Sequence, residues 1–394
     1  MKKIYMDHTA GMPVDSRVID AMKPYFNTTY GNPSSLHSFA QEARKGLDNA
    51  REKIAELIGA EKREEIFFTS GATESNNWAI RGLAARAKDK GKHIITTSIE
   101  HMSVINVCKH MIKKGFKVSF LPVDKYGVVD LEALKQELTN DTILVSIMYA
   151  NGEIGTIEPI KEISEIVHTR NACLHVDATA AIGMVKLDVQ KKGIDLLTVS
   201  SNDMYGPKGI GALYIKKGTP LEPLIFGGGQ ERGFRSGTEN LPGIAGMGKA
   251  AELMKNELEE EKNKLIRLRD KFIKVLLETI PYSFLNGHPS KRLPNNVAVR
   301  FSFIEGESML LNLEMAGVSA SSGSACTAKT LEPSHVLRAI GLKHEEAHGS
   351  LLFTLGKQNS ENDVDYVLGL MPDIVKRLRA MSPLTPKELK GSVH

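Results

Sequence analysis

Cysteine is scarce in this sequence, and its scarcity limits the chemistry that the chain can perform. Three cysteines, Cys108, Cys173 and Cys326, occur in 394 residues, far apart and without C-x-x-C spacing. The pattern argues against a disulfide framework and against a zinc site within one chain, and it favours a reducing compartment, the cytoplasm.

Long hydrophobic runs and an excess of one charge are also lacking. No stretch of 18 apolar residues occurs, and the first residues, MKKIYMDHTAGMP, contain no apolar signal-peptide core. We therefore expect an unexported protein without a membrane partner. The net charge is +4, with both signs mixed along the chain, and we expect no direct contact with nucleic acid.

Short apolar runs alternate with amphipathic helical segments from about residue 60 onward. The runs cover residues 65–70, 93–98, 117–122, 142–150, 173–179, 194–201 and 209–215. Strands that alternate with helices predict an α/β fold with a mainly parallel sheet, covered by helices on both faces.

A long helix is predicted over residues 250–280, with an apolar stripe that includes Leu258, Leu265 and Phe272. We place the domain boundary along it. Residues 15–255 then form a large α/β domain, and residues 1–14 together with 256–394 form a smaller α+β domain. The smaller domain would contain strands at 296–302 and 350–355 and helices near 307–316 and 361–380.

Candidate binding residues follow the predicted strands, where parallel sheets bind ligands. In SGATES (70–75), Gly71 precedes a helix that should begin near Glu74, and free amides at its start suit a phosphate. Such turns are also common without a ligand. Asp177 ends a strand, where a carboxylate caps a helix, forms an ion pair or keeps a pyridine nitrogen protonated. His101 could be structural, lie flat on a heteroaromatic cofactor, or act as an acid–base.

Cys326 is the best candidate for a reactive thiol. It lies in ASSGSACTAKT (320–330), where small residues on both sides indicate an exposed loop. Cys108 lies in a helical pattern and Cys173 opens a strand, which favours packing roles for both.

Many segments in one order resemble the cysteine desulfurases of the NifS/IscS type, within the class V aminotransferases. They extend from about Tyr5 to Leu384 and include GNPSSLHSFA, FTSGATESNN, HVDAT, YGPKGIGALYI, GGGQERGFRSGTEN, SSGSACT and LEPSHVLRAIGL. The resemblance implies a homodimer with the fold of type I enzymes that depend on pyridoxal 5′-phosphate (PLP). That fold has a large domain with a mainly parallel seven-stranded sheet and a smaller α+β domain.

The resemblance also implies roles for individual residues. Ala72, Thr73, Ser200 and, from the neighbouring subunit, Thr238 would bind the cofactor phosphate. His101 would stack on its ring, and Asp177 would pair with its ring nitrogen. Cys326 would accept sulfur from L-cysteine as a persulfide, or ligate a transient iron–sulfur cluster together with a scaffold protein of the IscU type. Residues 377–384 resemble the scaffold-binding region of the family, although a solvated helix end explains them equally well.

The sequence departs from the family where the cofactor ring and the substrate would lie. Asp203 matches the lysine that forms the Schiff base with PLP, and Asn202 matches the preceding histidine. Leu352 matches the arginine that binds the substrate carboxylate. Further replacements are Gly152 for asparagine, Ala180 for glutamine and Gln230 for histidine. A carboxylate cannot form an imine, so PLP would bind without a covalent bond at best.

Two functions remain open at this point. In the first, the chain desulfurates cysteine as its family does, with another amine such as Lys208 in place of the missing lysine. In the second, it is a catalytically degenerate homologue that acts as a PLP-independent sulfur acceptor, a cluster ligand or an assembly partner, with sulfide as one sulfur source. Another PLP-fold activity on a different substrate is a weaker third hypothesis.

Overall fold

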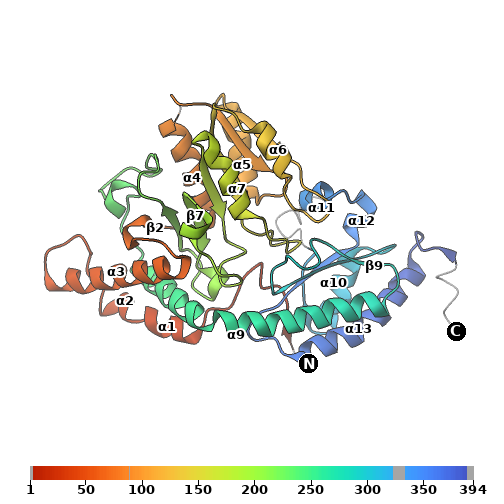
Figure 1. Cartoon of the computed structure of the whole chain (residues 1–394). Coiled ribbons are helices and arrows are strands. Elements are labelled where there is room, and N and C mark those ends of the chain that lie inside the picture. The colour runs from red at the N-terminus through yellow and green to blue at the C-terminus, as the bar shows by residue number, and fades with distance from the viewer. Residues whose placement is uncertain (1–2, 88, 323–332, 388–394) are drawn as a thin grey trace.

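The computed structural model describes residues 3–87, 89–322 and 333–387. A large sheet with flanking helices lies beside a smaller sheet, and one long helix runs along both (Figure 1). None of the helices in these ranges is long and apolar enough to cross a membrane.

The large sheet contains seven strands in the order β2-β8-β7-β6-β5-β3-β4. Their bounds are β2 (Ile66–Thr69), β3 (His93–Thr97), β4 (Lys117–Leu121), β5 (Thr142–Met148), β6 (Cys173–Asp177), β7 (Leu196–Ser200) and β8 (Gly211–Ile215). Only β8 runs antiparallel to its neighbours β2 and β7; the other pairs are parallel. The predicted mainly parallel seven-stranded sheet is confirmed.

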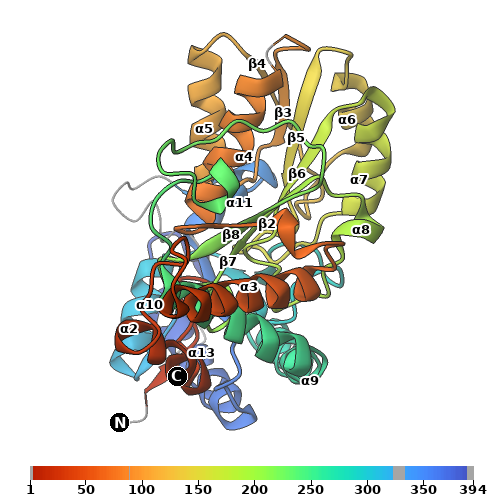
Figure 2. The same cartoon turned by 90° about the vertical axis from the view of Figure 1, so that its left-hand side faces the viewer.

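Helices cover both faces of this sheet because alternate strand residues point to opposite sides. Phe67 packs with α4 (Ala72–Ala87) and α5 (Met102–Lys113), whereas its neighbours Ile66 and Phe68 pack on the other side. That second side carries α3 (Ser38–Ile58), α6 (Leu131–Glu137), α7 (Ile160–Val167) and α8 (Val189–Lys192). Figure 2 shows α4 and α5 on one side of the strands and α6, α7 and α8 on the other.

A smaller unit lies at the other end of the molecule. Its antiparallel sheet has the order β12-β10-β9, formed by β9 (Ser283–Leu285), β10 (Asn296–Phe301) and β12 (Ser350–Thr354). A two-stranded parallel sheet pairs β1 (Ile4–Tyr5) with β11 (Val318–Ser319). The helices of this unit are α10 (Gly306–Met315), α11 (His335–Ala339), α12 (His344–His348) and α13 (Glu361–Met381). Two further helices, α1 (Ser16–Met22) and α2 (Pro24–Asn27), follow the N-terminal strand β1. The pairing of β1 with β11 supports our proposal that residues 1–14 belong to the smaller domain.

The long helix α9 (Leu241–Thr279) begins earlier than the prediction of residue 250. The side chain of Asn240 caps its first turn by accepting from the Gly243 amide at 3.1 Å. The glycines at 243, 246 and 248 disfavour a helix, because glycine is a poor helix former. Packing explains their presence. A Cβ on Gly248 would lie 2.5 Å from Cα of Ala50 in α3, so glycine lets the two helices approach closely.

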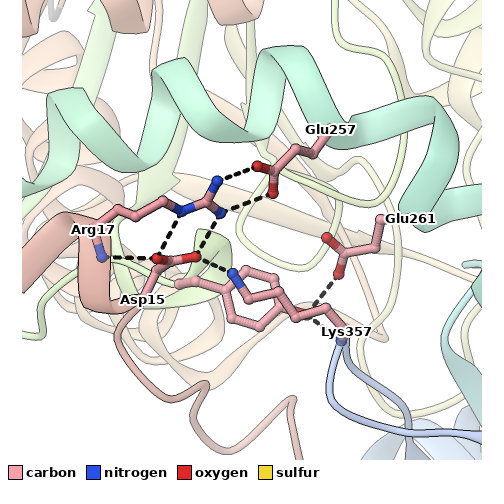
Figure 3. Close-up of polar contacts among 6 residues, drawn as sticks. Asp15, Arg17, Glu257, Glu261 and Lys357 are labelled. Atoms are coloured by element: carbon pink, nitrogen blue, oxygen red, sulfur yellow. Dashed lines mark hydrogen bonds and ion pairs between the residues drawn. The ribbon is translucent and has the colours of Figure 1, made fainter.

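A polar network ties the N-terminal segment and the smaller unit to α9 (Figure 3). Arg17 bonds Asp15 at 2.8 Å and Glu257 of α9 at 2.5 Å, and Lys357, after β12, pairs with Asp15. The hydrogen bond from Arg17 holds the pKa of Asp15 well below its usual range. Buried Tyr205 extends this network, since its hydroxyl donates to Glu261 at 2.6 Å and accepts from the Lys357 amide at 2.8 Å.

Tyr205→Phe should therefore destabilise the fold. The change removes one buried hydroxyl with two hydrogen bonds and leaves Glu261 and the Lys357 amide without that partner, so we expect a loss of about 1–3 kcal/mol in the free energy of unfolding. Urea denaturation measures it. Tyr366→Phe is the control, because the Tyr366 ring is 43% exposed, and its effect should stay within about 0.5 kcal/mol. Equal effects of the two changes would contradict the proposed role of Tyr205.

Candidate active site

Six of the residues to which the sequence analysis gave cofactor-binding or catalytic positions line one cavity of about 400 Å³. They are Ala72, Thr73, His101, Asp177, Ser200 and Asp203. The parallel strands cause this grouping, because β3, β6 and β7 end at the same edge of the sheet and β2 ends there too. Residues separated by more than a hundred positions in the sequence therefore surround one space.

One end of this cavity is suited to a phosphate. Helix α4 begins at Ala72, rather than near Glu74 as expected, because Gly71 makes the turn with a φ of 149°, which favours glycine. The first amides of a helix have no partner within the helix and attract anions. A Cβ on Gly71 would meet no atom within 4 Å, so the open cavity lies directly over this backbone. The Ser200 hydroxyl lines the same cavity and donates to Asn202 Oδ1 at 2.7 Å.

Asp177 is buried at the end of β6 and is held by neutral donors. Its Oδ1 accepts from the Thr179 amide at 3.0 Å and the Thr179 hydroxyl at 2.5 Å. Its Oδ2 accepts from Nδ2 of Asn76 at 2.7 Å. The carboxylate thus caps the turn after β6, rather than a helix, and it also lines the cavity. No cation neutralises it among its recorded partners, which suits a carboxylate that pairs with a protonated ring nitrogen.

Asn76 was missed by the sequence analysis. It is fully buried in α4, where its side-chain amide also donates to the Ser103 hydroxyl at 2.8 Å. The sequence signal for Asn76 was a polar residue among apolar neighbours on the buried face of a helix. Only the fold shows that this side chain orients Asp177.

His101 caps the N-terminus of α5 and lines the cavity. Its Nδ1 accepts from the Ser103 amide at 3.1 Å and lies 2.8 Å from the Ser103 hydroxyl. These bonds fix the ring at the cavity wall. They give His101 a structural role, and its stacking or acid–base role stays a prediction.

Asp203 lies in the short 3₁₀ turn Asn202–Met204, directly after β7. Its Oδ2 accepts from Nδ2 of Asn202 at 3.0 Å. Burial, with a contribution from the charge of Asp177, raises the pKa of Asp203 from 3.8 to about 7. The cavity therefore contains a carboxyl group that changes charge near neutral pH.

The other replacements line the same region. Gly152 and Ala180 both line the cavity, and a Cβ on Gly152 would lie 3.5 Å from that of Ala180. Two small residues thus lie next to each other and leave one patch of the wall without a polar side chain. Leu352 lines an adjoining space of about 210 Å³ that shares His101 and Gly152 with the main cavity.

The adjoining space also contains two glutamates that the sequence analysis did not single out, Glu100 and Glu153. Burial raises the pKa of each to about 8. Glu153 accepts from the Ser334 hydroxyl at 2.7 Å. Among the described residues that line this space there is no lysine or arginine to bind a substrate carboxylate.

The remaining predicted residues lie elsewhere. Cys326 is outside the described residues. Burial raises the pKa of the Cys108 and Cys173 thiols to about 12, which fits the packing roles expected for them. Thr238 is exposed and is not part of this cavity wall, so its contribution to a neighbouring subunit stays a prediction.

The residues present fit PLP in part. The start of α4 with Ser200 fits the phosphate, and Asp177 fits the ring nitrogen. The aldehyde has no matching amine in this wall, because no lysine is among the described residues that line the cavity.

Known proteins match this chain over nearly its whole length. A family model described as aminotransferase class-V matches residues 4–367. Cysteine desulfurase IscS 1 of Archaeoglobus fulgidus is 59% identical over 380 residues, which cover 96% of this chain and 99% of that protein. Cysteine desulfurase IscS of Methanosarcina thermophila is 54% identical over 389 residues, with 99% and 96% coverage. A solved NifS-like protein has a TM-score of 0.90 at 39% identity and covers 96% of this chain and 100% of its own.

The raised pKa of Asp203 predicts a pH-dependent stability. Between its unfolded value near 3.8 and its folded value of about 7, the folded state binds more protons, so stability falls as pH rises through this window. Asp203→Asn removes the titration. Its melting temperature should exceed that of the natural chain at pH 8, and the gap should shrink toward pH 4.

Calorimetry across this pH range measures the gap. Asp373→Asn, an exposed change in α13, should give a curve parallel to that of the natural chain. A gap for Asp203→Asn that does not vary with pH would mean that Asp203 keeps an ordinary pKa.

Proposed function

Because the chain belongs to the aminotransferase class-V family, we propose that it supplies sulfur for iron–sulfur cluster assembly as a cysteine desulfurase of the IscS type. Cys326 would carry the sulfur as a persulfide. The observation that carries this proposal is the identity of 59% and 54%, over 96% or more of the chain, to two proteins named cysteine desulfurase IscS. In that family, the reaction converts L-cysteine to L-alanine in the cytoplasm and serves a scaffold of the IscU type.

The described residues would divide the binding task among themselves. Ala72 and Thr73 would offer helix amides to the phosphate, with Ser200 beside them. Asp177, oriented by Asn76 and Thr179, would hold a proton on the ring nitrogen. PLP, when bound, supplies an electron sink for carbanion chemistry. His101 would cover the ring and limit the access of water.

A second candidate function is favoured by Asp203 and Leu352. A missing general base typically costs about 10²–10⁴-fold in rate, and a missing bond to a charged substrate about 1.5–3 kcal/mol. In this alternative the chain is a catalytically degenerate homologue. Cys326 would accept a sulfane sulfur from a persulfide donor, which is released as its thiol, or would ligate a cluster on the scaffold whose sulfur comes from free sulfide, in both cases without PLP. The two candidates share the role of Cys326 and differ in the source of sulfur.

An assay of alanine and sulfide formation from cysteine distinguishes the two candidate sources of sulfur. The desulfurase function predicts that the natural chain with added PLP forms both products, whereas the degenerate alternative predicts little turnover. Asp203→Lys should retain yellow PLP through dialysis, yet turn over slowly because Leu352 cannot bind the substrate carboxylate. The double change Asp203→Lys/Leu352→Arg should raise turnover by roughly tenfold or more over Asp203→Lys.

Cys326→Ser should abolish activity in the double variant, whereas Cys173→Ser should not. Fast turnover by the natural chain would refute the degenerate alternative. Full activity of Asp203→Lys alone would mean that Leu352 matters little.

We also propose a homodimer, in which Thr238 would reach the neighbouring cavity. Large apolar side chains are exposed close together in the sequence near the N-terminus, with Leu36 92% and Phe39 51% exposed. Exposed apolar surface of this kind often marks an interface.

Light scattering after gel filtration should give the mass of a dimer. Leu36→Asp/Phe39→Asp should shift the mass toward a monomer if this surface is the interface. Leu311→Asp, at a side chain that is 67% exposed on α10, is the control and should leave the dimer intact. A monomeric natural chain would remove Thr238 from any site.

A further inference from the structure

The charges around the main cavity are unusual for a site that is expected to hold an anionic cofactor. Among the described residues that line it, the titratable side chains are Glu74, Asp177, Asp203, His8 and His101, and neither lysine nor arginine is included. Glu74 is paired with Arg235 at 2.9 Å. Asp177 and Asp203 have only neutral recorded donors. The wall is therefore complementary to a ligand that carries positive charge in two places.

Side-chain length adds a second argument at Asp203. Counted from Cα, an aspartate oxygen occupies the same place in the chain of bonds as Cδ of lysine. The nitrogen of a lysine at this position would be two bonds further out, which is roughly 2.5 Å for ordinary bond lengths. Charge-assisted N–H···O bonds are about 2.7–2.9 Å long. If a nitrogen of the ligand lies where the lysine nitrogen would be, it is thus within hydrogen-bonding distance of the Asp203 carboxylate.

We propose that this cavity binds the amine form of the cofactor, pyridoxamine 5′-phosphate, with its 4′-ammonium group on the Asp203 carboxylate. The amine that the family carries on the protein is then carried by the ligand. This inference rests on the proposed function, since it takes the cavity as the cofactor site of the family. The start of α4 and Ser200 bind the phosphate, Asp177 binds the ring nitrogen, and no covalent bond to the protein forms.

Three ligands that differ only at the 4′ position test the proposal: pyridoxamine 5′-phosphate (amine), PLP (aldehyde) and 4′-deoxypyridoxine 5′-phosphate (methyl). Equilibrium dialysis with the full-length natural chain at pH 8 gives their dissociation constants. We expect the amine to bind about tenfold or more tightly than the methyl compound, the size of one charge-assisted hydrogen bond. PLP should bind like the methyl compound.

Substitutions of Asp203 test whether this residue causes the preference for the amine. Asp203→Asn should reduce the preference for the amine over the methyl compound to near onefold, without weakening the methyl compound. Asp203→Lys should invert the selectivity, because its amine condenses with PLP and repels the ammonium group. Asp373→Asn should change none of the three constants.

The pH dependence provides an independent readout. Because the pKa of Asp203 is raised to about 7, the preference for the amine should grow from pH 6 to pH 8 in the natural chain. In Asp203→Asn it should stay flat, even though Glu74, Asp177, His8 and His101 face the same cavity and remain present.

The outcomes separate this inference from the proposed function. Equal or tighter binding of PLP than of the amine would overturn the inference and leave the PLP site in place. If none of the three ligands binds, both the inference and the assignment of this cavity as a cofactor site are wrong. The role of Cys326 in sulfur transfer is tested separately, by the assay of alanine and sulfide. An amine preference that survives in Asp203→Asn would also refute the inference.

Discussion

The parallel pairing of β3, β5, β6 and β7 is the constraint on which the candidate site depends, because it brings their carboxyl ends to one edge of the sheet. His101 follows β3, Asp177 ends β6, and Ser200 ends β7. None of these residues is close to another in the sequence. The sheet holds them in place because β3, β5, β6 and β7 are buried almost throughout, so that a shift in register would disrupt their packing.

Within this frame the described residues that line the cavity include no lysine or arginine. Asp203 lies in the cavity wall and Leu352 lines the adjoining space, where Glu100 and Glu153 are kept largely protonated by burial. The Gly71 turn and the hydrogen bonds to Asp177 hold the surrounding backbone and this carboxylate in place. An ordered cavity with this distribution of charge agrees better with a distinct ligand preference than with general decay of the site.

The turn that contains Asp203 is also tied to the smaller unit. Tyr205 lies two residues further on, adopts a left-handed conformation with a φ of 59°, and bonds both α9 and the segment after β12. Lys357 in that segment pairs with Asp15 next to α1. Displacement of the smaller unit would thus be transmitted to the turn at Asp203, because the same hydroxyl serves both elements.

The order of apolar runs and helices was enough to predict the α/β class, the seven strands and their mainly parallel arrangement, because periodicity and strand propensity are local properties. Matching segments such as FTSGATESNN and YGPKGIGALYI were enough to identify the family, whereas the match of Asp203 to the family's lysine stays a prediction. The start of α9 was missed because its glycines are explained only by the close approach of α3. The tertiary structure alone decided that Asn76 holds Asp177, that Gly152 and Ala180 are neighbours, and that burial beside Asp177 raises the pKa of Asp203. These are distances and solvent exposures between segments far apart in the chain, and no local pattern encodes them.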